Sequence, residues 1–318
     1  MSELYSMMDE ALGIAGRMDL DEIEIYGLKN KISKVRMGDN SILSSYNIID
    51  QGLGIRVVND SGIGFSATSL AEGSEIEKVI REAYKISKIR KIKPGYTLPG
   101  IKANANVKKI YDKKIVNLSE EEKLDYANLM LQASNKVDER IKDNAGELGF
   151  IDYEVFIKNL RDETVKDRGT KIEAALTSTA KEGDSYSEGS DRKYCRTLKS
   201  FHPYEIAKNA ANSAIERLRA VDLKEGKYDL IIDPPTTGEL CYWFCRYLNP
   251  AYAETYYPTL KGKIGEKVVN EILSIYDDPT HPGGYNSSCI DDEGVATTRT
   301  PLVTGGILRN FIYDTLSA

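Results

Sequence analysis

The chain has 318 residues, enough for two domains with substantial hydrophobic cores. Hydrophobic residues make up 41% and charged residues 29%, which excludes a disordered chain. The formal net charge of −6 argues against nucleic acid or an anionic membrane surface as a general partner.

The start of the chain shows no targeting signal. Residues 1–5 lack the basic region and apolar stretch of a signal peptide, and no apolar run of roughly 18 residues occurs anywhere. Four cysteines are then expected to be reduced thiols. We therefore expect a cytoplasmic protein with no membrane partner.

The first 92 residues predict an N-terminal domain with two helices and an antiparallel meander. Apolar residues recur at helical spacing over 3–18 and again over 69–92. Between these helices, apolar runs are separated by turn signals such as Gly38-Asp39-Asn40. The runs predict strands over 23–28, 32–37, 42–49, 53–58 and 63–68.

Residues 93–222 predict a linker and a middle α+β region. The stretch 93–112 is rich in proline and glycine and has little periodicity, which is typical of a linker. Ser119 and Glu122 match a capping box at the start of a helix predicted over 119–140. Further elements are strands over 153–157 and 164–179 and a helix over 203–218.

Residues 223–318 predict the beginning of a C-terminal domain. Its expected elements are a buried strand over 228–232, helices over 236–248 and 266–275, and a hairpin of 295–303 with 307–313. The whole chain is thus predicted to be an α+β protein, with antiparallel sheets flanked by helices.

Histidines are too few for the common hydrolytic sites. Only His202 and His281 occur, each in a loop directly before a proline, a position typical of surface or helix-cap residues. No His-Glu pair occurs, so a HExxH zinc site is excluded.

Cys241 and Cys245 lie one helical turn apart on the helix predicted over 236–248. Aromatic neighbours favour core packing for both thiols. A metal or redox pair completed by an outside ligand is the alternative.

Glycine pairs and a tyrosine cluster are the remaining candidates. Gly52-x-Gly54 and Gly62-x-Gly64 lack the third glycine and helix start of a nucleotide site, so turns and close strand packing explain them better. An aromatic cluster either lines a groove for an extended peptide or covers the core, and consists of Tyr252, Tyr256 and Tyr257.

Several blocks, in order along most of the chain, resemble the TldD/PmbA proteins, whose older name is modulators of DNA gyrase. The N-terminal blocks are Gly52–Val58 and Ser61–Thr68. The later blocks are Tyr228–Pro234, Gly262–Val268, Ile275–Thr280, Pro282–Gly284, Asp291–Val295, Thr298–Thr300, Gly306–Leu308 and Tyr313-Asp314.

The resemblance implies a two-domain fold and a cytoplasmic dimer of paired subunits. A TldD-like subunit carries His-Glu-x-x-x-His on the helix after the Asp-Pro block, takes a cysteine ligand from later in the chain, and hydrolyses peptides and unfolded segments. Its PmbA-like partner, also called TldE, keeps the fold and lacks the motif.

This chain departs from the catalytic pattern at the metal helix. Tyr242 and Tyr247 stand where the two histidines are expected, and Trp243 stands where the glutamate is expected. Tyrosine is a poor zinc ligand and tryptophan cannot abstract a proton. The departure implies that this chain binds no cofactor, and that zinc is held by a TldD-like partner subunit.

A second departure is length, because family members continue well beyond the block at Tyr313-Asp314. We therefore expect the C-terminal domain, residues 223–318, to be incomplete. Strands that should pair with the hairpin would be missing, and an unpaired apolar edge invites association. The isolated chain is expected to be completed by a partner or poorly soluble.

These features predict a non-catalytic subunit of a TldD/PmbA-type metallopeptidase complex that acts on peptides. Its expected partner is a TldD-like catalytic subunit or a second copy of itself. The alternatives are an atypical metallopeptidase that uses Cys241 and Cys245, and an inactive truncated paralogue. A direct role on DNA gyrase has no support from the acidic composition.

Overall fold

The chain forms two compact units in the computed structural model, which describes residues 3–69, 73–92, 94–101, 105–250 and 258–318. The first unit comprises residues 1–221 and 280–297, and the second comprises 222–279 and 298–318. Segment 280–297 therefore packs with the first unit, although it lies far along the sequence.

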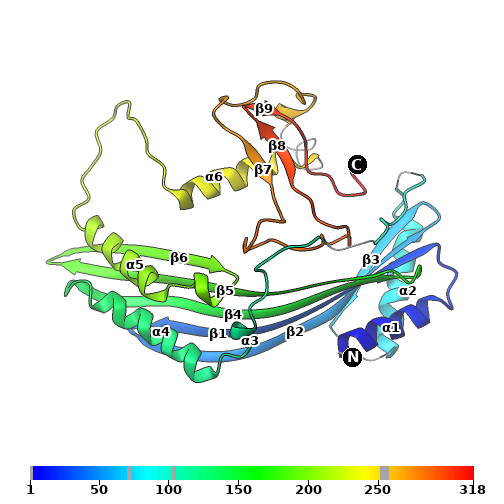
Figure 1. Cartoon of the computed structure of the whole chain (residues 1–318), viewed down its shortest axis with the longest axis horizontal. Coiled ribbons are helices and arrows are strands. Elements are labelled where there is room, and N and C mark those ends of the chain that lie inside the picture. The colour runs from blue at the N-terminus through cyan, green and yellow to red at the C-terminus, as the bar shows by residue number, and fades with distance from the viewer. Residues whose placement is uncertain (1–2, 70–72, 93, 102–104, 251–257) are drawn as a thin grey trace. The chain divides into compact units, whose positions relative to one another are not determined.

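A six-stranded antiparallel sheet with the order β3-β2-β1-β4-β5-β6 forms the first unit (Figure 1). The expected regions 1–92 and 93–222 share this sheet, because β1 pairs with β4 along most of its length. The strands are β1 (Glu22–Gly38), β2 (Ser41–Asn59), β3 (Gly62–Thr68), β4 (Ile141–Asn159), β5 (Thr164–Glu182) and β6 (Ser185–Cys195).

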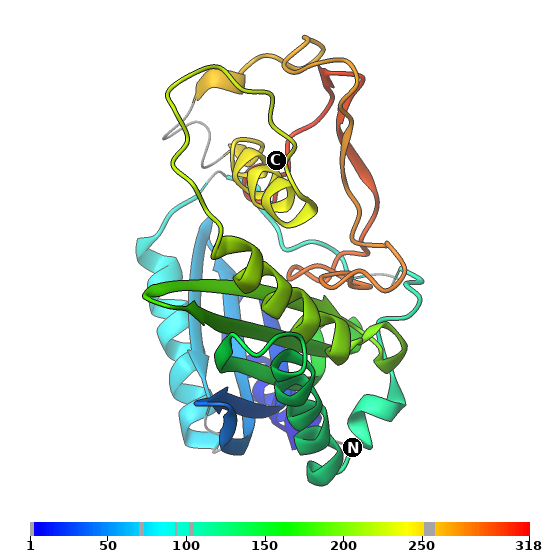
Figure 2. The same ribbon diagram turned by 90° about the vertical axis from the view of Figure 1, so that its left-hand side faces the viewer.

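Helices cover the two ends of the sheet and pack on the same face of it (Figures 1 and 2). At one end α1 (Glu3–Ala15) and α2 (Gly73–Ile89) pack on Ile23 and Ile25 of β1. At the other end α4 (Glu120–Asn135) and α5 (Pro203–Arg217) pack on Val35 and Met37. All four β1 residues are odd-numbered, so their side chains share one face. Two short elements, α3 (Lys113–Val116) and η1 (Leu198–Ser200), lie in the connections.

Strands β1 and β2 are each continuous, although the sequence predicted two shorter strands in place of each. Polar residues at Lys29, Asn30 and Lys31 interrupt the apolar alternation at the centre of β1. The helical layers leave this central part uncovered, so no apolar face is needed there. The break in the apolar alternation therefore marks a stretch of β1 that no helix covers, and does not mark a turn of the chain.

The middle of the chain holds more strand than predicted. The capping box is confirmed, since Ser119 Oγ accepts from Glu122 N at 3.1 Å and Glu122 Oε2 accepts from Ser119 N at 2.8 Å. The helix predicted over 119–140 ends earlier, at Asn135, and β4 begins at Ile141. The first part of β4 and all of β6 were not predicted, because their polar residues hide the period of a strand.

The second unit contains α6 (Pro234–Arg246), η2 (Pro258–Leu260) and a three-stranded sheet ordered β7-β8-β9. The predicted hairpin is confirmed in a shorter form, because β8 and β9 pair across Gly305 and Gly306. The strands are β7 (Ile275–Asp277), β8 (Thr300–Thr304) and β9 (Ile307–Leu308). A small core consists of Leu248, Leu260, Leu302, Val303 and Leu308.

Two elements predicted in this unit were wrong. Residues 228–232 form no strand and are exposed, with no apolar layer packed on them. Residues 266–275 form no helix, because Val268 N donates to Gly306 O at 2.9 Å and Leu308 N donates to Glu266 O at 3.0 Å. The backbone of that segment thus pairs with the β8–β9 turn. Among the described residues, none of the helices has the length and apolarity needed to cross a bilayer.

Candidate functional site

Helix α6 carries the positions of the predicted degenerate metal motif. Asp233 caps the helix, and its Oδ1 accepts from Thr236 N at 2.9 Å. The side chains of Tyr242 and Trp243 are more than half exposed. Tyr247, at the C-cap, packs against the small core of the second unit.

These side chains do not fit a zinc site. A neutral phenol is a poor zinc ligand, and an indole N–H can only donate a hydrogen bond. The guanidinium of Arg246 lies 5.0 Å from the Trp243 ring centre, which places a cation beside this helix surface. Within the described part of the chain, no three His, Cys, Asp or Glu side chains converge as a ligand set.

Cys241 and Cys245 are free thiols on this helix, and both are partly buried. Cys245 packs against the core of the second unit. Burial raises the pKa of the Cys245 thiol, and the neighbouring Cys241 and Asp277 raise it further. A metal ligand must be a thiolate, so this environment disfavours ligation by Cys245.

The other residues singled out by sequence lie apart from a catalytic arrangement. His202 occupies the N-cap position of α5, as its place before Pro203 suggested. His281 lies in an exposed turn, where its carbonyl oxygen accepts from Ser287 Oγ at 2.7 Å. The tyrosine cluster falls outside the described residues, so the peptide cleft remains a prediction for Tyr252, Tyr256 and Tyr257.

A polar groove lies on the sheet face opposite the helices. Even-numbered residues of β1 and β2 and odd-numbered residues of β4 and β5 point to this face. Segment 280–297 packs across it. Two cavities of about 180 and 310 Å³ lie there, and both are lined by Tyr26 and Asp292. The Tyr26 hydroxyl donates to Asp292 Oδ1 at 3.2 Å.

Arg196 fastens segment 280–297 to the sheet and is only 1% exposed. Its Nη1 donates to the carbonyl oxygens of Tyr285 and Ser287 at 2.7 and 3.2 Å. Its Nε and Nη2 both donate to Ile110 O, and Nη2 also donates to Tyr153 Oη at 2.7 Å. Because all five N–H groups of Arg196 donate in these hydrogen bonds, its role is structural: it acts as a clamp that holds segment 280–297 on the sheet.

Tyr153 continues this network into the smaller cavity. Its hydroxyl donates to Asp167 Oδ2 at 3.3 Å, and Ser288 Oγ donates to the same oxygen at 2.8 Å. The second oxygen of Asp167, Oδ1, is buried without a hydrogen-bond partner. Burial raises the pKa of Tyr153 to about 12, so its hydroxyl remains protonated. Lys171 lies on β5, as Asp167 does. Its pKa is lowered by burial and, to a smaller extent, by the nearby charge of Arg196.

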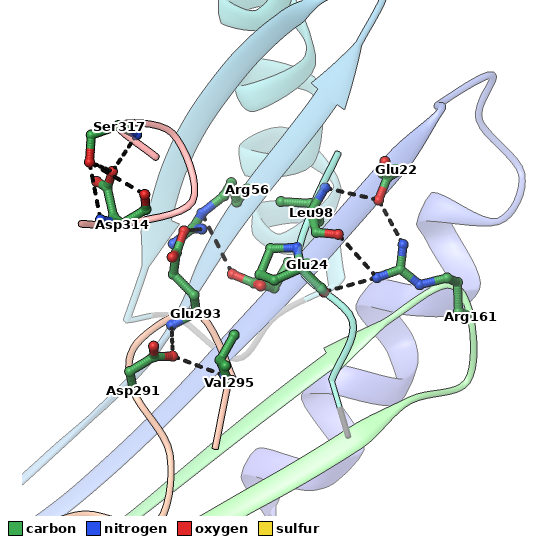
Figure 3. Close-up of polar contacts among 11 residues, drawn as sticks. Glu22, Glu24, Arg56, Leu98, Arg161, Asp291, Glu293, Val295, Asp314 and Ser317 are labelled. Atoms are coloured by element: carbon green, nitrogen blue, oxygen red, sulfur yellow. Dashed lines mark hydrogen bonds and ion pairs between the residues drawn. The ribbon is translucent and has the colours of Figure 1, made fainter. Parts of the chain in front are cut away.

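Glu24 and Arg56 line the larger cavity, and Figure 3 shows the two side chains beside Glu293. Arg56 Nε lies 3.5 Å from Glu24 Oε1, and its Nη1 donates to Glu293 Oε1 at 3.3 Å. Asp291 Oδ1 orders the loop by accepting from the backbone N–H groups of Glu293 and Val295, both at 2.9 Å. Burial raises the pKa of Glu24 to about 7, an effect that Arg56 opposes and Glu293 increases.

The groove offers both acceptors and a donor beside aromatic surface. Its carboxylates include Glu24 and Asp292, and the Lys171 ammonium lies 4.6 Å from the Tyr285 ring centre. Such a mixture suits a polypeptide, whose backbone both donates and accepts. Sequence reasoning missed the groove, because its residues come from several strands and a distant segment. The only signal was the block at Asp291–Val295.

Family models match nearly the whole chain. The model described as PmbA/TldA metallopeptidase domain 1 matches residues 23–87, the central-domain model matches 113–218, and the C-terminal-domain model matches 225–318. The chain belongs to the PmbA/TldD metallopeptidase family. One of the sequence blocks that carry the resemblance, Asp291–Val295, contributes to the polar groove in this family member.

Relatives of this PmbA/TldD-family chain include archaeal metalloproteases. A metalloprotease of Methanocaldococcus jannaschii is 26% identical over 93% of this chain and 66% of its own length. A zinc metalloprotease TldD homolog of Saccharolobus solfataricus is 26% identical over 84% of this chain and 59% of its own length. The chain thus spans about two thirds or less of the length of these relatives.

Solved structures support the fold of this PmbA/TldD-family chain. A putative modulator of a DNA gyrase from Thermotoga maritima matches 98% of this chain and 71% of that chain, with a TM-score of 0.87 and 25% identity. TldE from Thermococcus kodakarensis matches 98% of this chain and 70% of that chain, with a TM-score of 0.79 and 18% identity. The latter shows a shared fold alone.

Proposed function

We propose that this chain is the non-catalytic subunit of a PmbA/TldD-type metallopeptidase assembly. In this assembly it presents the polar groove to a peptide or unfolded segment, while a TldD-like subunit holds zinc and cleaves the bond. A cytoplasmic location is part of the proposal, and reduced thiols, the default there, match the four cysteines that form no disulfide.

One observation carries the proposal, which is the donor set of α6. In the register that the family resemblance implies, Tyr242, Trp243 and Tyr247 of this helix stand where a catalytic subunit has its two histidines and its glutamate. Tyrosine and tryptophan supply neither a strong zinc ligand nor a general base. The groove on the sheet face, by contrast, keeps buried and ordered polar groups such as Asp167 and Glu24.

A reconstitution experiment tests the proposal. The purified chain is compared alone and mixed with a HExxxH-bearing subunit from the same cells, for zinc content by elemental analysis and for cleavage of an unfolded protein. We expect the lone chain to contain no stoichiometric zinc and to show no chelator-sensitive cleavage. We expect the mixture to cleave, and cleavage to disappear when the histidines of the other subunit are replaced by alanine.

A matched variant tests the alternative of an atypical metal site. Replacing both Cys241→Ser and Cys245→Ser removes the two candidate thiolates. We expect no change in zinc content or in the activity of the mixture. If the lone wild-type chain carries zinc and cleaves, and the double variant does neither, then the chain is an enzyme by itself and the proposal is wrong.

A further inference from the structure

A cavity of about 280 Å³ lies at the centre of the large sheet, on the face that carries the helices. Two neighbouring rows of paired residues form its floor. In one row, Lys31 of β1 lies between Ile49 of β2 and Asp152 of β4. In the next row, Ser33 of β1 pairs with Asn47 of β2. The polar groove lies on the opposite face of the sheet, so this cavity is separate from it.

Apolar side chains line one part of the cavity. Ile115 of α3 and Phe150 of β4 are each 3% exposed, whereas Ile49 is 65% exposed. An isoleucine this exposed beside a cavity offers apolar surface that a ligand can bury. A cavity of roughly 150 Å³ holds a benzene ring in another protein. The larger volume here therefore has room for an apolar ring or branched chain with a short polar extension.

Ser33 gives the cavity an unsatisfied polar atom. The residue is 5% exposed, and its Oγ has no hydrogen-bond partner among the residues that the structure describes. Buried hydroxyl groups are usually paired, because an unpaired one loses its hydrogen bonds to water without replacement. A ligand atom that accepts this O–H would remove the cost.

Three charged side chains line the cavity, and two of them are already paired. Lys123 Nζ lies 2.7 Å from Glu120 Oε1, and Asp152 Oδ2 lies 3.2 Å from Arg168 Nη2. Lys31 is exposed and forms no salt bridge within the described part of the chain. Its ammonium group is therefore available to an anionic ligand.

We propose that this cavity binds a small monocarboxylate with an apolar body, which is either a free acid or the C-terminal residue of a peptide. The carboxylate accepts from the Lys31 ammonium and the Ser33 hydroxyl, and the apolar body lies against Ile49 and Phe150. The Asn47 amide, opposite Ser33, can donate to the second carboxylate oxygen. A single unpaired cation does not suit a polyanion such as a nucleotide, because each buried charge needs a partner.

A pair of matched ligands provides the first test. The probes are 3-phenylpropionate and its neutral amide, 3-phenylpropionamide, followed by calorimetry and ligand-observed NMR on the purified chain. We expect the acid to bind saturably with a Kd of roughly 1 mM or tighter, and the amide to bind at least about tenfold more weakly. Equal affinities would contradict the proposal, because the cation would then contribute nothing.

Lys31→Met tests the cation while it keeps most of the aliphatic stem. We expect the Kd of 3-phenylpropionate to rise about tenfold, the usual effect of losing a hydrogen bond to a charged group. Lys29→Met is the matched control. It lies two residues away on the same face of β1 and does not line the cavity, so the Kd should stay unchanged.

Ser33→Ala separates a binding role from a structural one. The hydroxyl has no partner in the free chain, so its removal should leave the urea midpoint of unfolding equal to that of wild type or higher. The Kd of the acid should rise several-fold. A purely structural role for Ser33 predicts the reverse, with stability lost and binding kept.

A peptide distinguishes the two sources of the carboxylate. The tripeptide alanyl-alanyl-phenylalanine with a free C-terminus is compared with 3-phenylpropionate. Tighter binding of the tripeptide identifies the end of a peptide chain as the ligand, and otherwise the ligand is a free acid.

Two results would overturn the proposal. One is that neither probe binds saturably up to about 10 mM. The other is that the acid binds with a Kd that neither Lys31→Met nor Ser33→Ala changes, because the ligand then lies elsewhere. None of these measurements involves zinc or cleavage, so this proposal and the proposed function fail separately.

Discussion

Glu24 combines burial with competition for a shared cation. It is 2% exposed on β1 and shares Arg56 with Glu293. Its pKa rises from the ordinary value of 4.5 to about 7, with burial as the main cause. Between about pH 4.5 and pH 7, the Glu24 carboxyl is protonated in the folded chain and ionised in the unfolded chain. The stability contributed by this protonation is complete below about pH 4.5 and is lost as pH rises through about 7.

Replacing Glu24→Gln should remove this pH dependence, because glutamine resembles the protonated carboxyl and does not titrate. Relative to wild type, the variant should gain up to about 3 kcal/mol of unfolding free energy between about pH 4.5 and pH 8. Urea denaturation at several pH values measures this difference. A stability difference that stays constant across this range would contradict the assignment.

The burial of Asp167 is a feature of the site that the sequence could not reveal. Alternation along β5 places it on the groove face, but it equally predicts an exposed, solvated carboxylate. Burial of Asp167 comes from Tyr153, Ser288 and the clamp at Arg196, which the fold brings to it from three other segments of the chain. No local pattern encodes such a meeting.

At the scale of elements, Gly64 lets helix α2 approach strand β3 closely. A Cβ added at Gly64 would overlap Ala83 O and lie 2.7 Å from Ser87 N, both on the backbone of α2. Gly62 meets the same helix at Ser87 O. The sequence predicted turns and close strand packing for these glycines, and the close contact at both of them is with the backbone of helix α2.

The variant Gly64→Ala should therefore push α2 away from the sheet and destabilise the chain by about 1–3 kcal/mol. Gly149→Ala is the matched control, because it also lies within a strand and its added Cβ would meet Glu173 no closer than 3.8 Å. Equilibrium denaturation in urea compares the two variants with wild type. Equal stabilities for both variants would show that α2 adjusts without cost.

Elements with their own apolar face were predictable, and elements that depend on remote partners were not. Helices α1, α2, α4 and α5 carry apolar stripes at helical spacing, and the Ser119 cap marks one start. The segment 266–275 carries the same spacing, yet its N–H groups pair with the β8–β9 turn. Strand β6 shows the opposite case. Its polar sequence carries no strand pattern, yet it forms a strand because it pairs with β5 and lies under α5.

At the scale of the whole molecule, the chain leaves the first unit and returns to it. Residues 219–232 have little regular structure and are exposed, whereas segment 280–297 lies on the sheet, held by Arg196 and the Ser288–Asp167 hydrogen bond. The connection is thus open to proteases, while its continuation is tied to the first unit by buried polar contacts.

Limited trypsin treatment should cut first at Arg219, Lys224 and Lys227, because local opening there costs little. The two fragments should still elute together under native conditions, since the C-terminal one contains segment 280–297. Denaturing gels and native size exclusion measure cleavage and association on the same sample.

Arg196→Met supplies the decisive variant for this experiment. It leaves the carbonyl oxygens of Tyr285 and Ser287 without their buried donor, a loss of a few kcal/mol by the usual cost of unpaired polar groups. The cut fragments of this variant should separate. Arg168→Met, which removes a more exposed ion pair with Asp152 on the same sheet, should leave them together. If the wild-type fragments separate at once, the clamp does not hold the segment. If the fragments of both variants stay together, contacts other than those of Arg196 hold it.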